Sequence, residues 1–410
     1  MLRWIIFIAV YILIDVYAFQ PIKTVTRNTW FYGIYVLSSV LVLGLLVYQL
    51  SLQGQSRMMS PSGMYIFGLF ISFLVPKLIL VLFMFGEDTL RFLVGAFSKF
   101  SGGTENVHLP SRRKFVGTLA LGIAAIPFVG LLYGMVQGKY NYKVLKYALE
   151  FEDLPDAFHG YTLTQISDVH SGSFDNPQKV AYAVDLINEQ QSDVILFTGD
   201  LVNNTAVEMN RWKQLFSTLK ARDGVFSVLG NHDYGDYVQW GSPAAKAENF
   251  SALKTLQKEM GWDVILNENR TLERNGQTIN IIGVENWGTN GFKKAGDLNR
   301  ACKGIAPNDF KILMSHDPSH WQEEVKQHTK NIQLTLSGHT HGMQFGIEIP
   351  GFLKWSPVQY RYKNWAGMYK EQGRYLYVNR GLGYLGYPGR LGIWPEVTVI
   401  TLKKKQNGPT

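Results

Sequence analysis

The sequence predicts an α/β domain that follows an all-α transmembrane region. Two observations lead to this fold class. Long apolar segments fill the first third of the 410-residue chain. From about residue 145 onward, short β-type runs alternate with amphipathic helical stretches, and this alternation favours buried sheets covered by helices. We therefore expect residues 1–140 to form a membrane region and residues 145–404 to form one large globular domain.

The membrane region contains four apolar segments. They occupy residues 2–19, 30–50, 63–85 and 115–136. Each approaches the about 20 residues that a helix needs to cross a bilayer, and a signal peptide would explain only one of them. We expect about four transmembrane helices, with three helices or a re-entrant segment as the alternatives. Lys77 lies within the third segment, where the sequence shows no partner for its charge.

The Lys and Arg residues of the short loops predict the orientation of these helices. Seven cations lie on one side and five on the other. The compact Arg112-Arg113-Lys114 triplet directly precedes the fourth helix, and we give it the most weight in assigning the orientation. It places this loop in the cytoplasm and the residues after about 137 outside the cytoplasmic (inner) membrane. Residues 111–116 also resemble a twin-arginine export signal, and ordinary positive-inside charge is the alternative. Both interpretations predict the same topology.

Composition narrows the possible partners. The net charge of +8 fits nucleic acid, an anionic membrane surface or a phosphorylated substrate. Because the cations are spread along the chain without a nucleic-acid-binding module, we expect no nucleic-acid partner. Cys302 is the only cysteine, so no intramolecular disulfide can form. A structural thiol is a better interpretation of this residue than a nucleophile.

The globular part is predicted element by element from its hydrophobic pattern. Strands are expected at residues 161–167, 193–198, 225–229, 264–266, 278–284, 311–315 and 333–337. Helices are expected at residues 177–189, 207–220, 244–260 and 320–328. The alternation of the two kinds of segment predicts the α/β class.

Polar motifs directly follow five of these strands. They are Asp168-Val169-His170, Gly199-Asp200, Gly230-Asn231-His232-Asp233, His316 and Gly338-His339-Thr340-His341. Loops at the carboxyl ends of strands are where α/β folds place their sites. The glycines allow sharp turns that bring neighbouring side chains toward a shared centre. Each motif alone is a weak signal, but five in this order are very hard to reach by chance.

The residue types of these motifs indicate a metal site. Asp, His and Asn without cysteine form a nitrogen and oxygen ligand set that suits Mn, Fe, Zn or Ni ions. The Asp-x-His and His-x-His pairs supply enough ligands for two divalent ions, and Asp200 is placed to bridge them. Two ions about 3.5–4 Å apart acidify a bridging water and clamp phosphoryl oxygens. These are the two requirements of phosphoester hydrolysis.

The order of the five motifs is similar to the signature of the calcineurin-like metallophosphoesterases. It spans Asp168 to His341, and the resemblance covers about residues 150–402. Among subfamilies, the chain looks most like bacterial membrane-associated phosphodiesterases with a twin-arginine signal. Residues 379–383 and 395–397, together with Arg390, also resemble that group. The fold implied is a four-layer β-sandwich flanked by α-helices.

The resemblance also implies a role for each motif residue. One ion would be held by Asp168, His170, Asp200 and His341. The other would be held by Asp200, Asn231, His316 and His339. His232 would act beside the leaving group, as a general acid or transition-state stabiliser, and Asp233 would orient and polarise His232.

An aromatic and basic stretch follows the last motif, at residues 345–369. Tryptophan and tyrosine together with lysine and arginine suit a membrane interface or an anionic headgroup. The alternative is a well-packed β-hairpin with ordinary surface cations. Farther along, Arg380 and Arg390 are candidates for contacting a phosphate, and surface positions are equally compatible with both.

The function predicted is that of a membrane-anchored hydrolase whose bridging hydroxide attacks phosphorus. We expect a phosphodiesterase acting on a lipid or cell-envelope phosphoester at the outer face of the membrane. One alternative is a UDP-2,3-diacylglucosamine pyrophosphohydrolase, which requires a cytoplasmic active site. A non-catalytic membrane sensor is another, although every ligand position is intact. A transporter is disfavoured, since four helices with one internal lysine make a poor pathway. The motifs leave open the metal, the preference between monoester and diester, and the oligomeric state.

Overall fold

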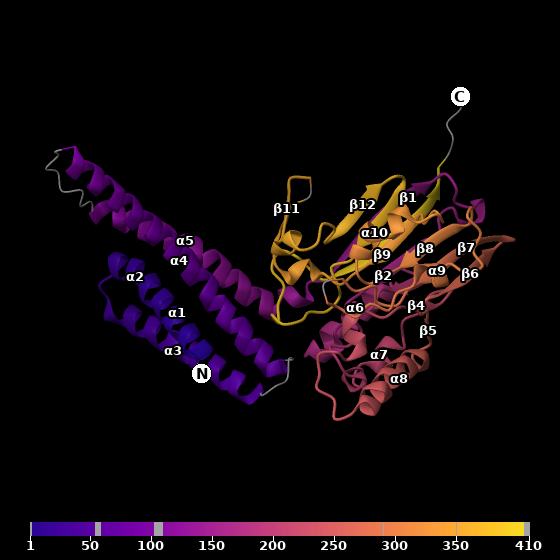
Figure 1. The fold of residues 1–410 in the computed structure, drawn as a ribbon, viewed down its shortest axis with the longest axis horizontal. Helices are drawn as coiled ribbons and strands as arrows, with labels where there is room; N and C mark the ends of the chain where they lie inside the picture. Colours follow the sequence, from indigo (N-terminus) through magenta and orange to yellow (C-terminus); the bar gives the residue numbers. More distant parts are fainter. Residues whose placement is uncertain (1, 54–58, 102–109, 290, 350, 406–410) are drawn as a thin grey trace. The chain divides into compact units, whose positions relative to one another are not determined.

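A computed structural model describes residues 2–53, 59–101, 110–289, 291–349 and 351–405. The chain divides into two compact units. One comprises Met1–Gly54 and Ser62–Val136, and the other comprises Gln137–Thr410 together with Gln55–Pro61. Figure 1 shows helices in the first unit and helices packed on sheets in the second.

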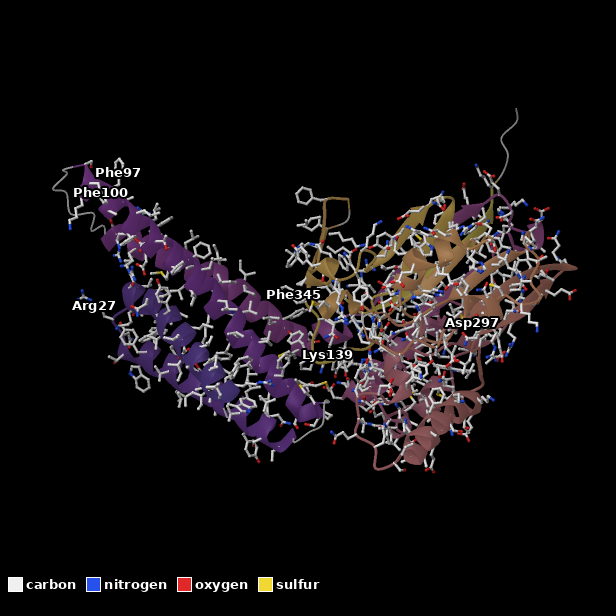
Figure 2. The ribbon with its side chains drawn as sticks, viewed as in Figure 1. Arg27, Phe97, Phe100, Lys139, Asp297 and Phe345 are labelled. Carbon is white, nitrogen blue, oxygen red and sulfur yellow. The ribbon has the colours of Figure 1, made fainter. Side chains whose placement is uncertain are left out.

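The first unit consists of long apolar helices. They are α1 (Leu2–Ala18), α2 (Gln20–Val25), α3 (Thr29–Gln53), α4 (Pro61–Phe100) and α5 (Pro110–Val136). With α1 and α2 taken as one segment, four spans are long and apolar enough to cross a membrane. Carbon atoms dominate their side chains, as Phe97 and Phe100 illustrate near the end of α4 (Figure 2). The expected four apolar helices are thus confirmed.

The helix α4 is longer than the apolar segment that predicted it. It has 40 residues where the pattern indicated 63–85. At about 1.5 Å per residue it is about 60 Å long, roughly twice the thickness of a bilayer core. Its C-terminal half carries Glu87 and Asp88, and both carboxylates form ion pairs with Arg113 of α5. These ion pairs join the C-terminal half of α4 to the first turn of α5.

Lys77 of α4 is buried among polar partners from α1 and α3. Its Nζ lies 2.6 Å from Oδ1 of Asp15 and donates to Tyr11 Oη at 2.8 Å and to Ser39 Oγ at 2.7 Å. The Ser39 hydroxyl in turn donates to Asp15 at 2.8 Å. The charge for which the sequence showed no partner is thus neutralised by a carboxylate 62 positions earlier in the chain. Such pairing is how charges are tolerated inside membranes.

Two six-stranded sheets form the centre of the second unit. The first has the order β1-β14-β2-β3-β4-β5 and the second the order β12-β13-β9-β8-β7-β6. The first sheet contains β1 (Lys143–Phe151), β2 (Thr162–Ile166), β3 (Val194–Phe197), β4 (Val225–Ser227), β5 (Trp262–Val264) and β14 (Glu396–Lys404). The second contains β6 (Glu268–Arg274), β7 (Gln277–Gly283), β8 (Phe310–Met314), β9 (Leu334–Ser337), β12 (Gly367–Glu371) and β13 (Arg374–Val378). A separate hairpin joins β10 (Ile347–Ile349) to β11 (Leu353–Trp355).

The sheets face each other, and helices cover their outer faces (Figure 1). In β3, Val194 and Leu196 enter the core between the sheets, whereas Ile195 and Phe197 face the helical side. This is why the strand is apolar at every position. The helices α6 (Pro177–Asn188), α7 (Lys213–Phe216) and α8 (Pro243–Glu259) cover the first sheet, and α9 (Leu298–Ala301) and α10 (Ser319–Glu323) cover the second. The predicted four-layer sandwich is confirmed.

The second unit differs from the predicted elements in several places. Strands β1, β12 and β13 lie outside the predicted ranges, and two further differences have a visible cause. The helix expected at residues 207–220 is replaced by a 3-10 turn, η4 (Ala206–Met209), and the single-turn α7. The chain turns between them because Trp212 is buried and its indole N–H donates to the backbone carbonyl of Ser171. The edge strand β6 was also not predicted, since its side chains alternate between intermediate and exposed positions and bury no apolar face.

Candidate metal centre

The five polar motifs converge at one end of the two sheets. The Asp168 loop follows β2, the Asp200 loop follows β3, and Asn231 begins the short helix η5 (Asn231–Tyr234) after β4. From the second sheet, His316 follows β8 and the His339–His341 loop follows β9. Parallel strands end at the same edge, so these loops meet there.

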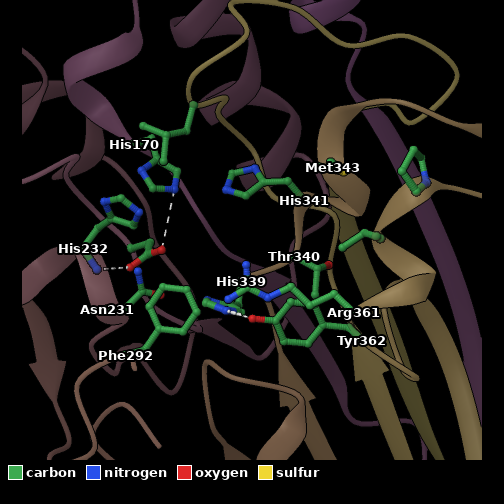
Figure 3. A pocket seen from close by; sticks show the side chains of 14 residues that line it. His170, Asn231, His232, Phe292, His339, Thr340, His341, Met343, Arg361 and Tyr362 are labelled. Carbon is green, nitrogen blue, oxygen red and sulfur yellow. Dashed lines mark hydrogen bonds and ion pairs between the residues drawn. The ribbon is translucent and has the colours of Figure 1, made fainter. Parts of the chain in front are cut away.

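Potential ligand atoms gather within 4.8 Å of one another in three overlapping groups. The groups are Asp168, His170 and His341; His170, Asp200 and His232; and Asp200, His316 and His339. Asn231 lines the same pocket (Figure 3). The structure therefore brings together every residue that the sequence analysis assigned as a ligand.

The backbone at this centre is strained in the way functional loops often are. Five of the expected ligands have left-handed backbone conformations: Asp168, His170, Asp200, His339 and His341, with φ between 45° and 74°. Non-glycine residues seldom adopt this region. Two glycines allow the loops to approach closely. A Cβ on Gly230 would lie 2.2 Å from Asp200 Oδ1, and one on Gly338 would lie 2.2 Å from Asp168 Oδ2.

The first cluster is built around Asp168, and its ligand atoms lie close together without ordinary partners. His341 Nε2 lies 3.3 Å from Asp168 Oδ1, and His170 Nε2 lies 3.6 Å from Asp200 Oδ2. These contacts are too long or too poorly directed to satisfy the rings. Both ring nitrogens of His170 and Nε2 of His341 are buried without a hydrogen-bond partner among the described residues.

In the second cluster, Asp200 Oδ2 lies 3.0 Å from His316 Nε2, and His316 Nε2 lies 3.3 Å from His339 Nδ1. Oδ1 of Asn231 is buried with no partner in the described part of the chain. Because a carboxylate, an amide oxygen and two imidazoles face one another, this donor set fits a divalent cation.

Outer partners fix which atom of each side chain faces the centre. His316 Nδ1–H donates to the Thr198 carbonyl at 2.7 Å, which leaves Nε2 pointing inward. His339 Nε2 is 2.7 Å from the Tyr362 hydroxyl, so Nδ1 faces the centre. Asn231 Nδ2 donates to the hydroxyl of Tyr237 at 2.8 Å, which turns its Oδ1 inward.

Burial and charge set the protonation of the cluster. Burial lowers the pKa of His316, but the Asp200 carboxylate outweighs this and raises the pKa to about 10. Burial lowers the pKa of His339 to about 4 and places the pKa of His170 well below its usual range. The His339 and His170 rings are thus neutral, and the neutral imidazole is the form that binds a metal. His316 is protonated and must lose a proton before it can bind a metal.

The contacts of His232 and Asp233 correct one expectation. The His232 ring donates from Nδ1 to the carbonyl of Asn203 at 2.7 Å and does not bond to Asp233. The Asp233 carboxylate instead accepts backbone N–H groups from Gly230 and from residues 200–202, at 2.8–3.3 Å. Asp233 therefore clamps the Asp200 loop onto η5, and a backbone carbonyl orients the His232 ring.

Arg380 and Arg390 are buried rather than exposed, so neither expectation for them holds. Arg380 forms ion pairs with Glu348 and Glu396. Arg390 is fully buried and donates to two glycine carbonyls. Its Nη2 lies 3.2 Å from His341 Nδ1. Arg380 is thus occupied by two carboxylates. Arg390 contacts the His341 loop through Nη2, while its Nη1 is buried without a hydrogen-bond partner among the described residues.

A cavity of about 240 Å³ opens over the clustered ligands. Figure 3 shows His170, His232 and His341 on one side of it and Phe292, His339 and Tyr362 on the other. Apolar side chains complete its wall: Phe292, Met343, Pro357, Val358 and Leu385. Arg361 lies at this wall, with its guanidinium 5.3 Å from the Phe292 ring centroid.

Comparison with known proteins gives the family. A family model described as "Probable Calcineurin-like phosphoesterase, transmembrane domain" matches residues 2–139, and one described as "Calcineurin-like phosphoesterase" matches residues 161–343. A transmembrane protein with metallophosphoesterase domain from Danio rerio is 30% identical over 336 residues, which cover 80% of this chain and 71% of that protein. The chain belongs to the calcineurin-like metallophosphoesterase family. Membership implies a phosphoester hydrolase that uses divalent metal ions, here joined to a transmembrane domain.

Bacterial relatives are also similar. The metallophosphoesterase YkuE of Bacillus subtilis (strain 168) is 29% identical over 300 residues, covering 72% of this chain and 98% of its own. Among solved structures, the NAD nucleotidase of Haemophilus influenzae matches with a TM-score of 0.37 and 14% identity, over 54% of this chain and 45% of that one. The phosphopantetheinyl hydrolase of Mycobacterium tuberculosis matches with a TM-score of 0.32 and 14% identity, over 54% and 89% of the two chains.

Proposed function

We propose that the chain is a binuclear-metal-dependent phosphodiesterase anchored in the cytoplasmic membrane. Residues 1–140 form its membrane region, and residues 145–404 form its catalytic domain. The observation that carries the proposal is the set of buried, unpartnered atoms of His170, His341 and Asn231. Buried polar atoms are rarely left without partners. Several such atoms around one centre support the presence of cations there.

Each ion has a natural ligand set in this arrangement. Asp168, His170, Asp200 and His341 would hold one ion, and Asp200, Asn231, His316 and His339 the other. When bound, two divalent ions (Mn, Zn, Fe or Ni) supply a hydroxide nucleophile at neutral pH and neutralise charge on the phosphoryl oxygens. Tyr362, Thr198 and Tyr237 keep the ligand atoms turned inward.

His232 is the residue proposed to act on the leaving group. With Nδ1–H held by Asn203, its Nε2 is the atom available to donate to the departing oxygen or to stabilise its charge. Burial lowers the pKa of His232, whereas Asp200 raises it. An anionic substrate beside the ring opposes the effect of burial and favours the protonated form that this role needs.

The cavity wall supports a diester as the substrate. A diester carries an organic group on each side of phosphorus, and the apolar side chains of Phe292, Met343 and Val358 offer a surface for the second group. A lipid or cell-envelope phosphoester has such a group, and it is available to a hydrolase with a transmembrane domain.

The orientation remains part of the proposal, with the catalytic domain at the outer face. A periplasmic-type reporter fused after residue 410 would be active in this topology. A reporter active only in the cytoplasm would favour the UDP-2,3-diacylglucosamine pyrophosphohydrolase alternative. Replacing Arg112 and Arg113 together by lysine tests the export signal, because twin-arginine transport would be abolished. The ion pairs of Arg113 with Glu87 and Asp88 give this arginine a second, structural role in the same chain.

Hydrolysis of an aryl phosphodiester and an aryl monoester tests the activity. The full-length protein in detergent would be assayed with Mn²⁺, Zn²⁺ or a chelator, beside Asp200→Asn and His232→Ala. We expect metal-dependent turnover that both substitutions remove, with the loss at His232 about 10²–10⁴-fold. Metal binding without turnover of either ester would support the non-catalytic sensor. Failure to bind metal would overturn the proposal.

A further inference from the structure

The exposed apolar side chains of the second unit are concentrated in one segment. Among its described residues, eight large hydrophobic side chains are exposed, and six of them fall between residues 343 and 360. These six are Met343, Ile347, Ile349, Phe352, Leu353 and Tyr360. Phe352 is 84% exposed. Scattered apolar side chains on a surface need no explanation, but a contiguous group indicates an interaction site.

The β10–β11 hairpin turns its apolar face away from the protein. The register pairs Ile349 with Leu353 on one face and Glu348 with Lys354 on the other. The polar face is held against the domain, because Glu348 forms an ion pair with Arg380 and Lys354 donates to the Ala366 carbonyl. Soluble proteins normally place the faces the other way round. The exposure of the apolar face is therefore fixed by specific contacts.

The base of the hairpin is well packed, so the segment is not a loosely folded part of the core. Val358, Tyr362, Trp365 and Ile393 form a small buried cluster directly beside it. Apolar residues of the same stretch are thus divided between a compact interior and an outward surface.

Charge around the hairpin favours an anionic partner. Arg361 and Lys363 are exposed just beyond Tyr360. No carboxylate among the described residues pairs with Arg361, and Lys363 only approaches Glu371 at 3.8 Å. Exposed aromatic and aliphatic side chains flanked by cations are typical of surfaces that enter the headgroup region of a bilayer.

The same segment forms part of the cavity wall. Met343, Val358 and Arg361 line the cavity above the metal centre. In addition, only residues 137–142 separate the last apolar helix from β1, which tethers the second unit to the bilayer surface. A surface that contacts the bilayer here would place the mouth of the cavity next to lipid headgroups.

We propose that the outward face of the β10–β11 hairpin, with Phe352 at its tip, docks into the interface of an anionic lipid bilayer and presents membrane lipids to the catalytic cavity. The inference rests on the proposed hydrolase function and names its substrate class as a phosphoester of a membrane-embedded amphiphile. The partner is the bilayer itself, recognised by apolar insertion and by the cations that flank the hairpin.

Fluorescence quenching in nanodiscs tests the docking. The full-length Phe352→Cys protein would carry an environment-sensitive fluorophore, and Val207→Cys, an apolar position that is 68% exposed, is the matched control. The one native thiol, Cys302, is buried. We expect lipid-borne quenchers to quench the label at residue 352 about threefold or more above the control when anionic lipid is present. Equal quenching at the two sites would overturn the proposal. A spectral shift that depends on protein concentration and not on lipid would also overturn it, in favour of a second copy of this chain.

A double substitution, Phe352→Ser with Leu353→Ser, separates docking from chemistry. Neither side chain lines the cavity. We expect turnover of a phospholipid in nanodiscs to fall about tenfold or more, since loss of one apolar insertion already corresponds to about tenfold and two are removed. Turnover of the soluble aryl diester should stay unchanged. Unchanged phospholipid turnover would contradict the docking. Absence of turnover on every ester by the unsubstituted protein would instead contradict the hydrolase function, and the quenching result would still decide the docking.

Discussion

Replacing Asp233 by asparagine separates two explanations of this carboxylate. In the structure, each of its oxygens accepts two backbone N–H groups: Oδ1 from Leu201 and Val202, and Oδ2 from Asp200 and Gly230. An asparagine retains one acceptor oxygen and turns its NH₂ group toward two N–H donors. Burial raises the pKa of Asp233 to about 7, so the carboxylate is ionised above that pH. Loss of two hydrogen bonds to the buried charge, at about 1.5–3 kcal/mol each, should then cost roughly 3–6 kcal/mol of folding free energy.

Thermal unfolding of the full-length, metal-loaded protein in detergent measures this cost. A domain of this size loses about 2–4 °C of Tm per kcal/mol, so we expect the transition of the catalytic domain to fall by about 6–24 °C. Metal affinity should fall with it, because the clamp positions the Asp200 loop. Asp236→Asn is the control, since that carboxylate is three residues away and pairs at the surface with Lys246.

The opposite result would refute this reasoning. If Asp233→Asn unfolded at the wild-type temperature but lost activity and shifted the pH profile, the carboxylate would act on the His232 ring as the sequence predicted. Loss of stability without a shift of the pH profile would mean that the Asn203 carbonyl, and not Asp233, orients the His232 ring.

Three further results are expected. Tyr362→Phe should weaken binding of one ion about 10–100-fold in a metal titration, because the hydroxyl that orients His339 is lost. Tyr360→Phe, at an exposed tyrosine, should leave the affinity unchanged. Equal affinities of the two variants would contradict the role of the Tyr362 hydroxyl. Metal binding should release a proton from His316, whose pKa is about 10 without metal, so affinity should rise toward alkaline pH by up to about tenfold per unit; calorimetric heats independent of the buffer would argue against this. Lys77→Met should destabilise the helical unit in detergent by up to about 3–5 kcal/mol, because the partly buried Asp15 carboxylate loses its cation. Adding Asp15→Asn should restore much of this stability; no rescue would mean that the pair is unimportant.

The candidate ligands were predictable because two local signals coincide. Asp168 and His316, for example, each follow an apolar run that must be a strand, and their side chains belong to the few types that bind metals. Parallel strands then bring the loops to a common edge without further information. The layers of the fold were predictable for the same reason, since the hydrophobic period distinguishes strands from helices.

The supporting contacts depend on long-range packing and left no local signal. The His232 ring is held by the carbonyl of Asn203, and a backbone carbonyl has no residue identity to recognise. Tyr362 reaches its histidine from a segment without clear periodicity. The composition of residues 345–369 favoured a membrane interface or a packed hairpin, but it did not indicate which face of the hairpin is turned outward. The apolar, polar, apolar order of Ile347, Glu348 and Ile349 is typical of a half-buried strand, and the contacts of Glu348 with Arg380 and of Lys354 with Ala366 reverse the face.

The ion pair inside the helical unit has a consequence for how the protein is made. Asp15 enters the membrane about 60 residues before Lys77 is synthesised, which at about 5–20 residues per second is a delay of roughly 3–12 s. During that time the first helix carries a carboxylate whose insertion costs about 2.5–3.5 kcal/mol near a helix centre. The first helix is therefore less stably inserted in the bilayer until the third span, which carries Lys77, is also inserted. Polypeptides that terminate before Lys77 would keep a carboxylate in the first helix without the cation that neutralises it.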